Sequence, residues 1–217
     1  VDKDLLSIQE ARALVRAARK AQQEFASLSQ EKVDSVVKAV AEAAMAQAEV
    51  LAALAVEETG FGKVPDKKIK NILASEKLLE AIKGMKTIGN LNEDKNKRLI
   101  EIAVPGGVIA GIIPSTNPTS TVIYKSIISL KAGNAIVFTP HPSAKKCIAK
   151  TVDMIKSALH NCGVSTDLVS YMSVPTIECS GQLLKLVDPI LATGRPGMVK
   201  PPRSPGTSAL RVGARNV

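Results

Sequence analysis

The run from Gly107 to Ile113 constrains the fold of this chain more than any other feature, because it contains no polar side chain. A strand of this composition is covered on both faces, which is typical of a parallel sheet. Helical and strand-like segments then alternate along the chain: 119–132, 134–139, 143–161, 168–174, 177–187 and 190–193. This alternation predicts an α/β fold with a doubly wound parallel sheet.

The first third of the chain predicts helices. Ser7 and Glu10 have the spacing of a capping box, so we expect a helix to begin at Ser7. Ser29 predicts the N-cap of a second helix, whose apolar stripe continues through 33–55 and whose end is marked by Gly60.

Pro65 predicts the start of a third helix, since proline is favoured in the first helical turn. Its apolar positions share one side, and we expect the other, solvated side to carry Lys67, Lys68 and Lys70. The segment 99–104 is strand-like. We therefore expect residues 1–97 to form an N-terminal helical segment that packs on a dinucleotide-binding α/β domain, residues 98–217.

The composition excludes several classes of protein. With 217 residues and 45% hydrophobic content, the chain can bury a core and is not a disordered tail. No stretch of about 18 uncharged apolar residues occurs, so no membrane partner is expected. The three cysteines, Cys147, Cys162 and Cys179, make no disulfide framework; we expect them to be small buried or half-exposed hydrophobes in a cytoplasmic protein.

The net charge of +9 does not indicate a nucleic-acid partner. Residues 195–217 contain five basic side chains and no acidic one, so the rest of the chain is only mildly basic. Aromatic residues make up 2% of the chain and tryptophan is absent, which argues against platforms for base stacking.

The loop after the apolar run reads Ile113-Pro114-Ser115-Thr116-Asn117-Pro118. Ligands of open α/β sheets bind beyond the carboxyl ends of strands, where such loops lie. One interpretation is an ordinary turn with an N-cap. The alternative is that flanking prolines hold the Asn117 amide as a rigid hydrogen-bond donor to an oxyanion.

A second loop, Thr139-Pro140-His141-Pro142, leads from a strand into a helix. It is either a capped helix start with an exposed histidine, or a contact to a nucleotide ribose or phosphate at a helix N-terminus. A third loop, 193–198, contains Gly194 and Gly197 in a Gly-x-x-Gly spacing, which by itself is weak support for pyrophosphate binding. No metal site is expected, because the two histidines are far apart and lack ligands at suitable spacing.

Taken together and in order, these segments resemble the CoA-acylating aldehyde dehydrogenases, including the aldehyde dehydrogenase part of bifunctional aldehyde/alcohol dehydrogenases. The resemblance covers essentially the whole chain, and its motifs are 57–63, 107–121, 131–145 and 192–200. It implies an aldehyde dehydrogenase-type Rossmann-like sheet preceded by helices. It also implies oxidation of an aldehyde, such as acetaldehyde, with NAD as cofactor and coenzyme A as acyl acceptor.

The resemblance also implies site residues. Asn117 corresponds to the oxyanion-hole amide. The dinucleotide is contacted from the three loops by Ile113, Pro114, Ser115, Thr116, Thr139, Pro140, His141, Pro142, Thr193, Gly194, Gly197 and Met198. Hydrolytic members of the superfamily have lysine where Thr139 falls and glutamate where Pro142 falls, so this sequence favours the acylating branch. A homo-oligomer is implied for the full-length enzyme, in the cytoplasm or alternatively in a bacterial microcompartment.

The resemblance has two departures. None of the three cysteines falls at the family's nucleophile position, which lies in a second domain beyond residue 217. We therefore expect this chain to be a fragment that turns over no aldehyde alone, with a non-catalytic nucleotide-binding or assembly module as the alternative. Relatives also carry glycine or alanine where this chain has Arg195, Pro201, Pro202, Arg211 and Arg215, which we interpret as an altered gene end.

Overall fold

A parallel sheet of five strands forms the centre of the molecule, in the order β5-β4-β3-β6-β7. The computed structural model describes residues 3–174, 176–193 and 208–212. The strands are β3 Val108–Ile112, β4 Ala135–Thr139, β5 Val169–Tyr171, β6 Pro189–Thr193 and β7 Ser208–Val212. The chain builds outward from β3 to β5 and then returns to the opposite side of β3 as β6. The predicted doubly wound sheet is confirmed; β7 had no counterpart in the sequence pattern.

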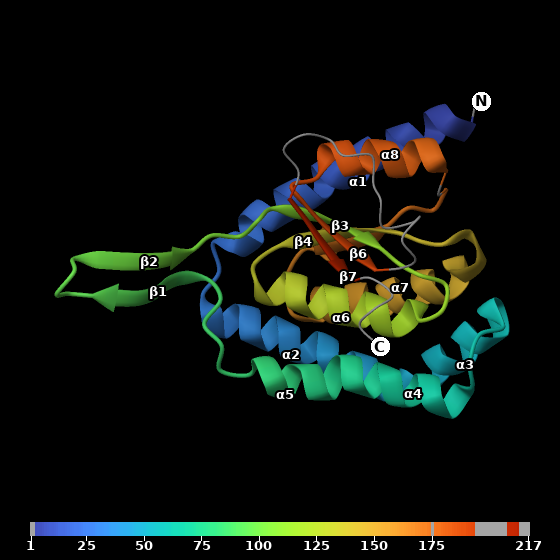
Figure 1. Cartoon of the computed structure of the whole chain (residues 1–217), viewed down its shortest axis with the longest axis horizontal. Helices are drawn as coiled ribbons and strands as arrows, with labels where there is room; N and C mark the ends of the chain where they lie inside the picture. Colours follow the sequence, from blue (N-terminus) through green and yellow to red (C-terminus); the bar gives the residue numbers. More distant parts are fainter. Residues whose placement is uncertain (1–2, 175, 194–207, 213–217) are drawn as a thin grey trace.

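Helices cover both faces of this sheet (Figure 1). On one face lie α6 Pro118–Lys131 and α7 Lys145–Asn161, and on the other α1 Lys3–Ala26 and α8 Ile177–Leu186. Short 3-10 turns at Pro142–Ala144 and Thr166–Leu168 precede α7 and β5. Because β3 and β4 lie between these two layers, every residue of both strands is buried.

A further layer of helices packs on the outer side of α6 and α7. It consists of α2 Gln30–Ala46, α3 Ala48–Thr59, α4 Val64–Ile72, a π-helical turn at Leu73–Lys77 and α5 Leu78–Ile82. The predicted signals at Ser29 and Gly60 are confirmed: Ser29 Oγ accepts a hydrogen bond from Lys32 N, and Gly60 closes α3 with φ 69°. Pro65 lies in the first turn of α4, as expected.

Two helix predictions were wrong. The first helix is already formed at Lys3, and Ser7 lies inside it, where its hydroxyl donates to Asp4 O. The expected helix through 33–55 is divided at Gln47 into α2 and α3, which meet at a bend of 63°. Within the described residues no single helix is long and apolar enough to cross a membrane; only α2 and α3 joined across this bend would meet that criterion.

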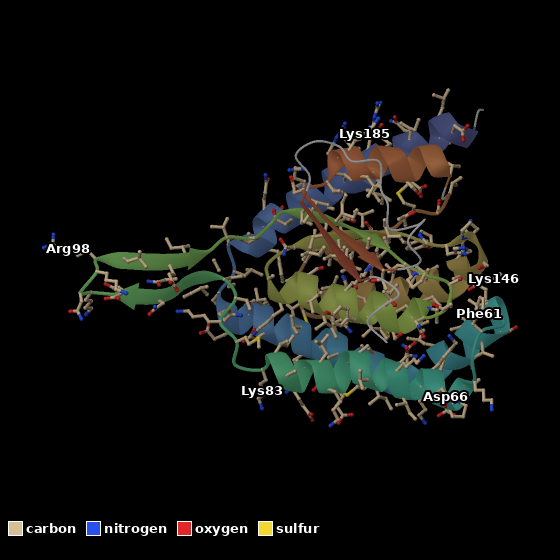
Figure 2. All side chains as sticks on the ribbon, in the orientation of Figure 1. Phe61, Asp66, Lys83, Arg98, Lys146 and Lys185 are labelled. Atoms are coloured by element: carbon tan, nitrogen blue, oxygen red, sulfur yellow. The ribbon has the colours of Figure 1, made fainter. Side chains whose placement is uncertain are left out.

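An antiparallel hairpin, β1 Gly89–Asp94 and β2 Leu99–Ala103, projects from the body of the molecule (Figure 1). Figure 2 shows Arg98 at its far end. The expected strand near 99–104 is therefore present, but it belongs to this hairpin and not to the central sheet. The span expected to be helical through residue 97 ends its helices at Ile82 and contains β1.

Candidate functional site at the carboxyl edge of the sheet

The carboxyl ends of β3, β4 and β6 meet at one edge of the sheet. Their register brings Ile112 level with both Thr139 and Ala192. The loop after β3, the loop after β4 and Thr193 at the end of β6 therefore share this edge. It adjoins the switch point, the gap between β3 and β6 where the direction of winding reverses and where ligands of such sheets bind.

Part of the predicted site falls outside the described residues. Gly194, Gly197 and Met198 lie there, as do Arg195, Pro201, Pro202 and Arg215. The backbone of Arg211 belongs to β7, level with Ala192. The predicted residues that the structure brings together are thus 113–117, 139–142 and Thr193.

The loop after β3 leads from a fully buried Ile113 to Asn117, which occupies the N-cap position of α6. The Asn117 side chain makes no capping hydrogen bond. Its backbone carbonyl instead accepts from Thr121 Oγ1 at 2.5 Å, and its Oδ1 accepts from Lys70 Nζ at 3.0 Å. Asn117 therefore occupies the N-cap position without using its side chain as a cap, and its Nδ2 is bonded to none of the described residues.

The lysines of α4 were predicted to lie on a solvated face, and for Lys67 this was wrong. Lys67 is only 5% exposed, and its ammonium donates to Thr116 O at 2.7 Å. Lys68 is half-buried and pairs with Glu49 of α3 at 2.7 Å, and Lys70 is exposed. The physical reason is that a long lysine stem can be buried while its head reaches a polar group, here a loop carbonyl. The apolar side chains of Ile69 and Leu73, by contrast, are each 62% exposed.

Burial and the charge of Lys70 lower the pKa of Lys67. Next to it, Asn71 is fully buried and joins three elements: its Oδ1 accepts from Thr119 Oγ1 at 2.9 Å, and its Nδ2 donates to Ala48 O at 2.9 Å. The spacing of Lys67 and Asn71, four residues apart on one helix face, is the sequence signal that could have indicated a polar contact from α4.

A second buried lysine joins the two strands at the switch point. Lys125 of α6 is 3% exposed, and its Nζ donates to Ile112 O at 2.8 Å and to Leu191 O at 2.7 Å. Burial lowers its pKa to about 7. A neutral amine has two hydrogens, and each has an acceptor here, so deprotonation removes the charge and keeps both bonds. No pattern in the sequence singled out this residue.

Two polar side chains of the loop after β4, His141 and Thr139, have hydrogen-bond partners among the described residues. His141 Nδ1 accepts from Ser143 N at 3.2 Å and contacts Ser143 Oγ at 2.7 Å, so the histidine caps the short turn that follows. Thr139 is buried and its hydroxyl bonds to that of Ser180 at 3.1 Å. Because Nδ1 accepts, neutral His141 carries its proton on Nε2, which remains available as a donor.

Glu58, near the end of α3, caps the N-terminus of α7. Its two carboxylate oxygens accept from Lys146 N and Cys147 N, both at 2.7 Å. The first amides of α7 are thus bonded to a carboxylate, whereas the phosphate interpretation of this loop expected them to be free.

The cysteines fit their prediction where the structure describes them. Cys147 is fully buried and Cys162 half-buried. Burial, followed by the hydrogen bond and charge of Glu58, raises the pKa of the Cys147 thiol to about 12. Among the described residues no group of three or more His, Cys, Asp or Glu side chains could hold a metal ion.

The fold and this edge define a Rossmann-like α/β protein with its candidate site at a switch point. The model of the aldehyde dehydrogenase family matches residues 5–194, so the chain belongs to the aldehyde dehydrogenase family. The bifunctional aldehyde-alcohol dehydrogenase AdhE of Escherichia coli K12 is 48% identical to it over 212 residues, which is 97% of this chain and 24% of AdhE.

Solved structures show the same relationship. A probable aldehyde dehydrogenase from Listeria monocytogenes is 54% identical, with a TM-score of 0.95 over 98% of this chain and 47% of its own. An acetylating aldehyde dehydrogenase from Geobacillus thermoglucosidasius is 48% identical, with a TM-score of 0.93 over 96% and 46%. The chain thus spans between about a quarter and a half of the length of these relatives.

Proposed function

We propose that this chain is the cofactor-binding part of an oxidoreductase that converts an aldehyde, CoA and NAD to acyl-CoA and NADH, with acetaldehyde as the aldehyde. The proposal rests on the position and hydrogen bonding of the Asn117 carboxamide. Its carboxamide lies at the carboxyl edge beside the switch point, it is not used to cap α6, and its Nδ2 is unbonded among the described residues. A buried strand and two prolines hold it, as a preorganised donor requires.

In this reaction Asn117 donates to the oxyanion that forms when a thiolate adds to the aldehyde carbonyl. Cys147 is excluded as that nucleophile, since its pKa of about 12 keeps it protonated near neutral pH. When bound, NAD accepts the hydride and CoA takes the acyl group. The residues of this chain bind and orient these molecules.

The loops after β3 and β4 would hold the cofactor, through residues 113–116 and 139–142, together with Thr193. No acidic side chain lies within 139–142, although the Glu58 carboxylate caps the first amides of α7 just after this loop. In this proposal His141 Nε2–H donates to a ribose hydroxyl or phosphate oxygen of the cofactor. Relatives support CoA and a nicotinamide dinucleotide as ligands: a Rhodopseudomonas palustris propionaldehyde dehydrogenase was solved with propionyl-CoA and an engineered glycolyl-CoA reductase with NADP+.

The cytoplasm is the proposed location, and a bacterial microcompartment is the alternative. A propionaldehyde dehydrogenase from such a compartment in Clostridium phytofermentans is 31% identical to this chain. The full-length enzyme is proposed to form a homo-oligomer.

The proposal is tested by titrating the chain with NADH and, separately, with CoA. NADH fluorescence is convenient because the chain has no tryptophan. We expect saturable binding of each ligand, and competition between them for one site. Loss of one hydrogen bond in His141→Ala weakens NADH binding about fivefold, for a bond worth ~1 kcal/mol.

The matched control is His160→Ala, which removes an exposed histidine at the far end of α7 and is expected to leave binding unchanged. Inorganic pyrophosphate at equal concentration controls for attraction of anions to a chain of charge +9. If pyrophosphate at the same concentration abolished the binding of NADH and CoA, or if the titrations did not saturate, the proposal would be contradicted. An assembly role would then be left.

A further inference from the structure

One face of α4 holds the loop that carries Asn117. Lys67 Nζ donates to Thr116 O at 2.7 Å, Lys70 Nζ donates to Asn117 Oδ1 at 3.0 Å, and Asn71 Oδ1 accepts from Thr119 Oγ1 at 2.9 Å. The three α4 residues are three and four positions apart, so they project from the same side of the helix. Four consecutive residues, 116–119, which span the end of the loop and the start of α6, therefore include three that are bonded to α4.

The chemistry of Lys70 fixes which way the Asn117 carboxamide faces. An ammonium group can only donate, so the carboxamide atom opposite Lys70 Nζ must be the oxygen. The nitrogen then lies on the side away from Nζ, with both of its hydrogens directed away from that contact. The positive charge of the Lys70 ammonium next to the carbonyl oxygen also polarises the amide, which makes its N–H groups stronger donors.

Lys67 makes the loop itself a fixed platform. It is buried, and it is paired with no carboxylate among the described residues. A buried cation without an acidic partner lowers stability unless its hydrogen bonds compensate, so it is weak as a purely stabilising device. Its bond to Thr116 O holds the backbone immediately before Asn117, and its charge lies at the same loop.

We propose that Lys70 is a positioning residue for Asn117: on a loop that Lys67 fixes, it orders the carboxamide and leaves Nδ2 as the donor to the oxyanion. This inference rests on the proposed role of Asn117 in aldehyde oxidation. Lys70 does not touch the reacting atoms; it acts through the asparagine.

The test is the side-chain amide signal of Asn117 in the full 217-residue chain labelled with ¹⁵N-asparagine. Asn117→Ala identifies the signal by its loss. In the unaltered chain we expect a heteronuclear NOE close to that of ordered backbone amides. In Lys70→Met we expect the signal to shift and its NOE to fall to the level of Asn96, an exposed asparagine of the hairpin turn. Lys70→Arg, which keeps a cationic donor, restores both.

Lys68→Met is the matched control, because Lys68 is on the same helix, carries the same charge and contacts Glu49 in place of the loop. It should leave the Asn117 signal unchanged. Lys70 is exposed, so the melting temperature of Lys70→Met should equal that of the unaltered chain, which separates positioning from stability.

An unchanged Asn117 signal in Lys70→Met, or an equal change in Lys68→Met, overturns the inference. The measurement needs neither NADH nor CoA, so the two proposals can fail separately. A chain that binds neither nucleotide but shows Lys70-dependent ordering contradicts the proposed function alone. Saturable NADH binding with an unaffected Asn117 contradicts the positioning role alone.

Discussion

Strands β2 and β3 are both rich in apolar residues, yet the molecule uses them in opposite ways. In β3, Val108–Ile112, every residue is buried, whereas four of the five residues of β2, Leu99–Ala103, are exposed and the fifth is half-buried. The difference lies in their partners. β3 pairs with β4 and β6 between two helical layers, while β2 pairs, in the described part of the chain, only with the polar strand β1. Burial is decided by the neighbours that the topology supplies.

This contrast bears on the site. The loop that carries Asn117 follows directly from the buried strand, and Lys125 bonds to the last carbonyl of that strand. Close packing of β3 therefore sets the position of the candidate donor. The hairpin projects away from this edge, so substitutions in it should leave the edge unaffected (Figure 1).

The largest effect is expected where β3 and β4 are in closest contact, at Gly111. A Cβ added there would lie 2.4 Å from Cδ1 of Phe138, whose ring is fully buried. We expect Gly111→Ala to lower the free energy of unfolding by about 3 kcal/mol, the upper part of the range for overpacked cores. Urea unfolding followed by circular dichroism measures it.

Gly181→Ala is its control. Gly181 lies in α8 with a helical backbone, and an added Cβ would meet no atom within 4 Å. Alanine there should stabilise the helix by roughly 0.5–1 kcal/mol. Equal destabilisation by both variants would show that the contact with Phe138 is not the cause.

The second-largest effect concerns the charge of Lys125, whose ammonium lies at the carboxyl end of β3. The pKa of Lys125 is lowered to about 7 in the folded chain, from an ordinary value of 10.5. Between these two values the unfolded chain binds a proton that the folded chain has released. The free energy of unfolding therefore rises with pH through this window, by up to about 1.4 kcal/mol per pH unit.

Lys125→Met removes this dependence. The unfolding free energy of the unaltered chain minus that of the variant should therefore increase from pH 7 to pH 9. Denaturant titrations at several pH values measure it. Lys95→Met, in the exposed turn of the hairpin, should show no such growth because no buried charge is changed. A difference that stays constant with pH would mean that Lys125 remains charged in the folded chain.

Local signals predicted local features of this fold well. The apolar run became β3, Ser29 caps α2, Gly60 ends α3 and Pro65 lies in the first turn of α4. Each depends on residues within about a helical turn or one strand. The resemblance added the family, which the comparisons confirm. The roles it assigned to Asn117 and the cofactor loops remain predictions.

What the sequence could not predict depends on contacts distant in the chain. The break at Gln47 lies beside Ala48, whose carbonyl accepts from Asn71, 23 residues further on. Lys67 is buried because it meets Thr116, which lies 49 residues away. Helical periodicity places a residue on a face of its own helix but does not show what covers that face. Lys125 was missed for the same reason, since its two acceptors are on separate strands.

The smallest effect is expected on the hairpin, at Ile102. This side chain is 63% exposed in β2, so Ile102→Thr removes little buried surface and keeps a β-branched residue suited to a strand. We expect the free energy of unfolding to change by less than about 0.5 kcal/mol, which is usual for surface substitutions. The same urea titration as for Gly111→Ala measures it, at two protein concentrations.

Ile109→Thr, the same exchange in buried β3, is the matched comparison and should cost about 2 kcal/mol or more, because it leaves a hydroxyl without a partner between two layers. If Ile102→Thr were as destabilising as Ile109→Thr, the hairpin would be packed against another surface in solution, and the contrast between the two strands would hold only for the isolated chain.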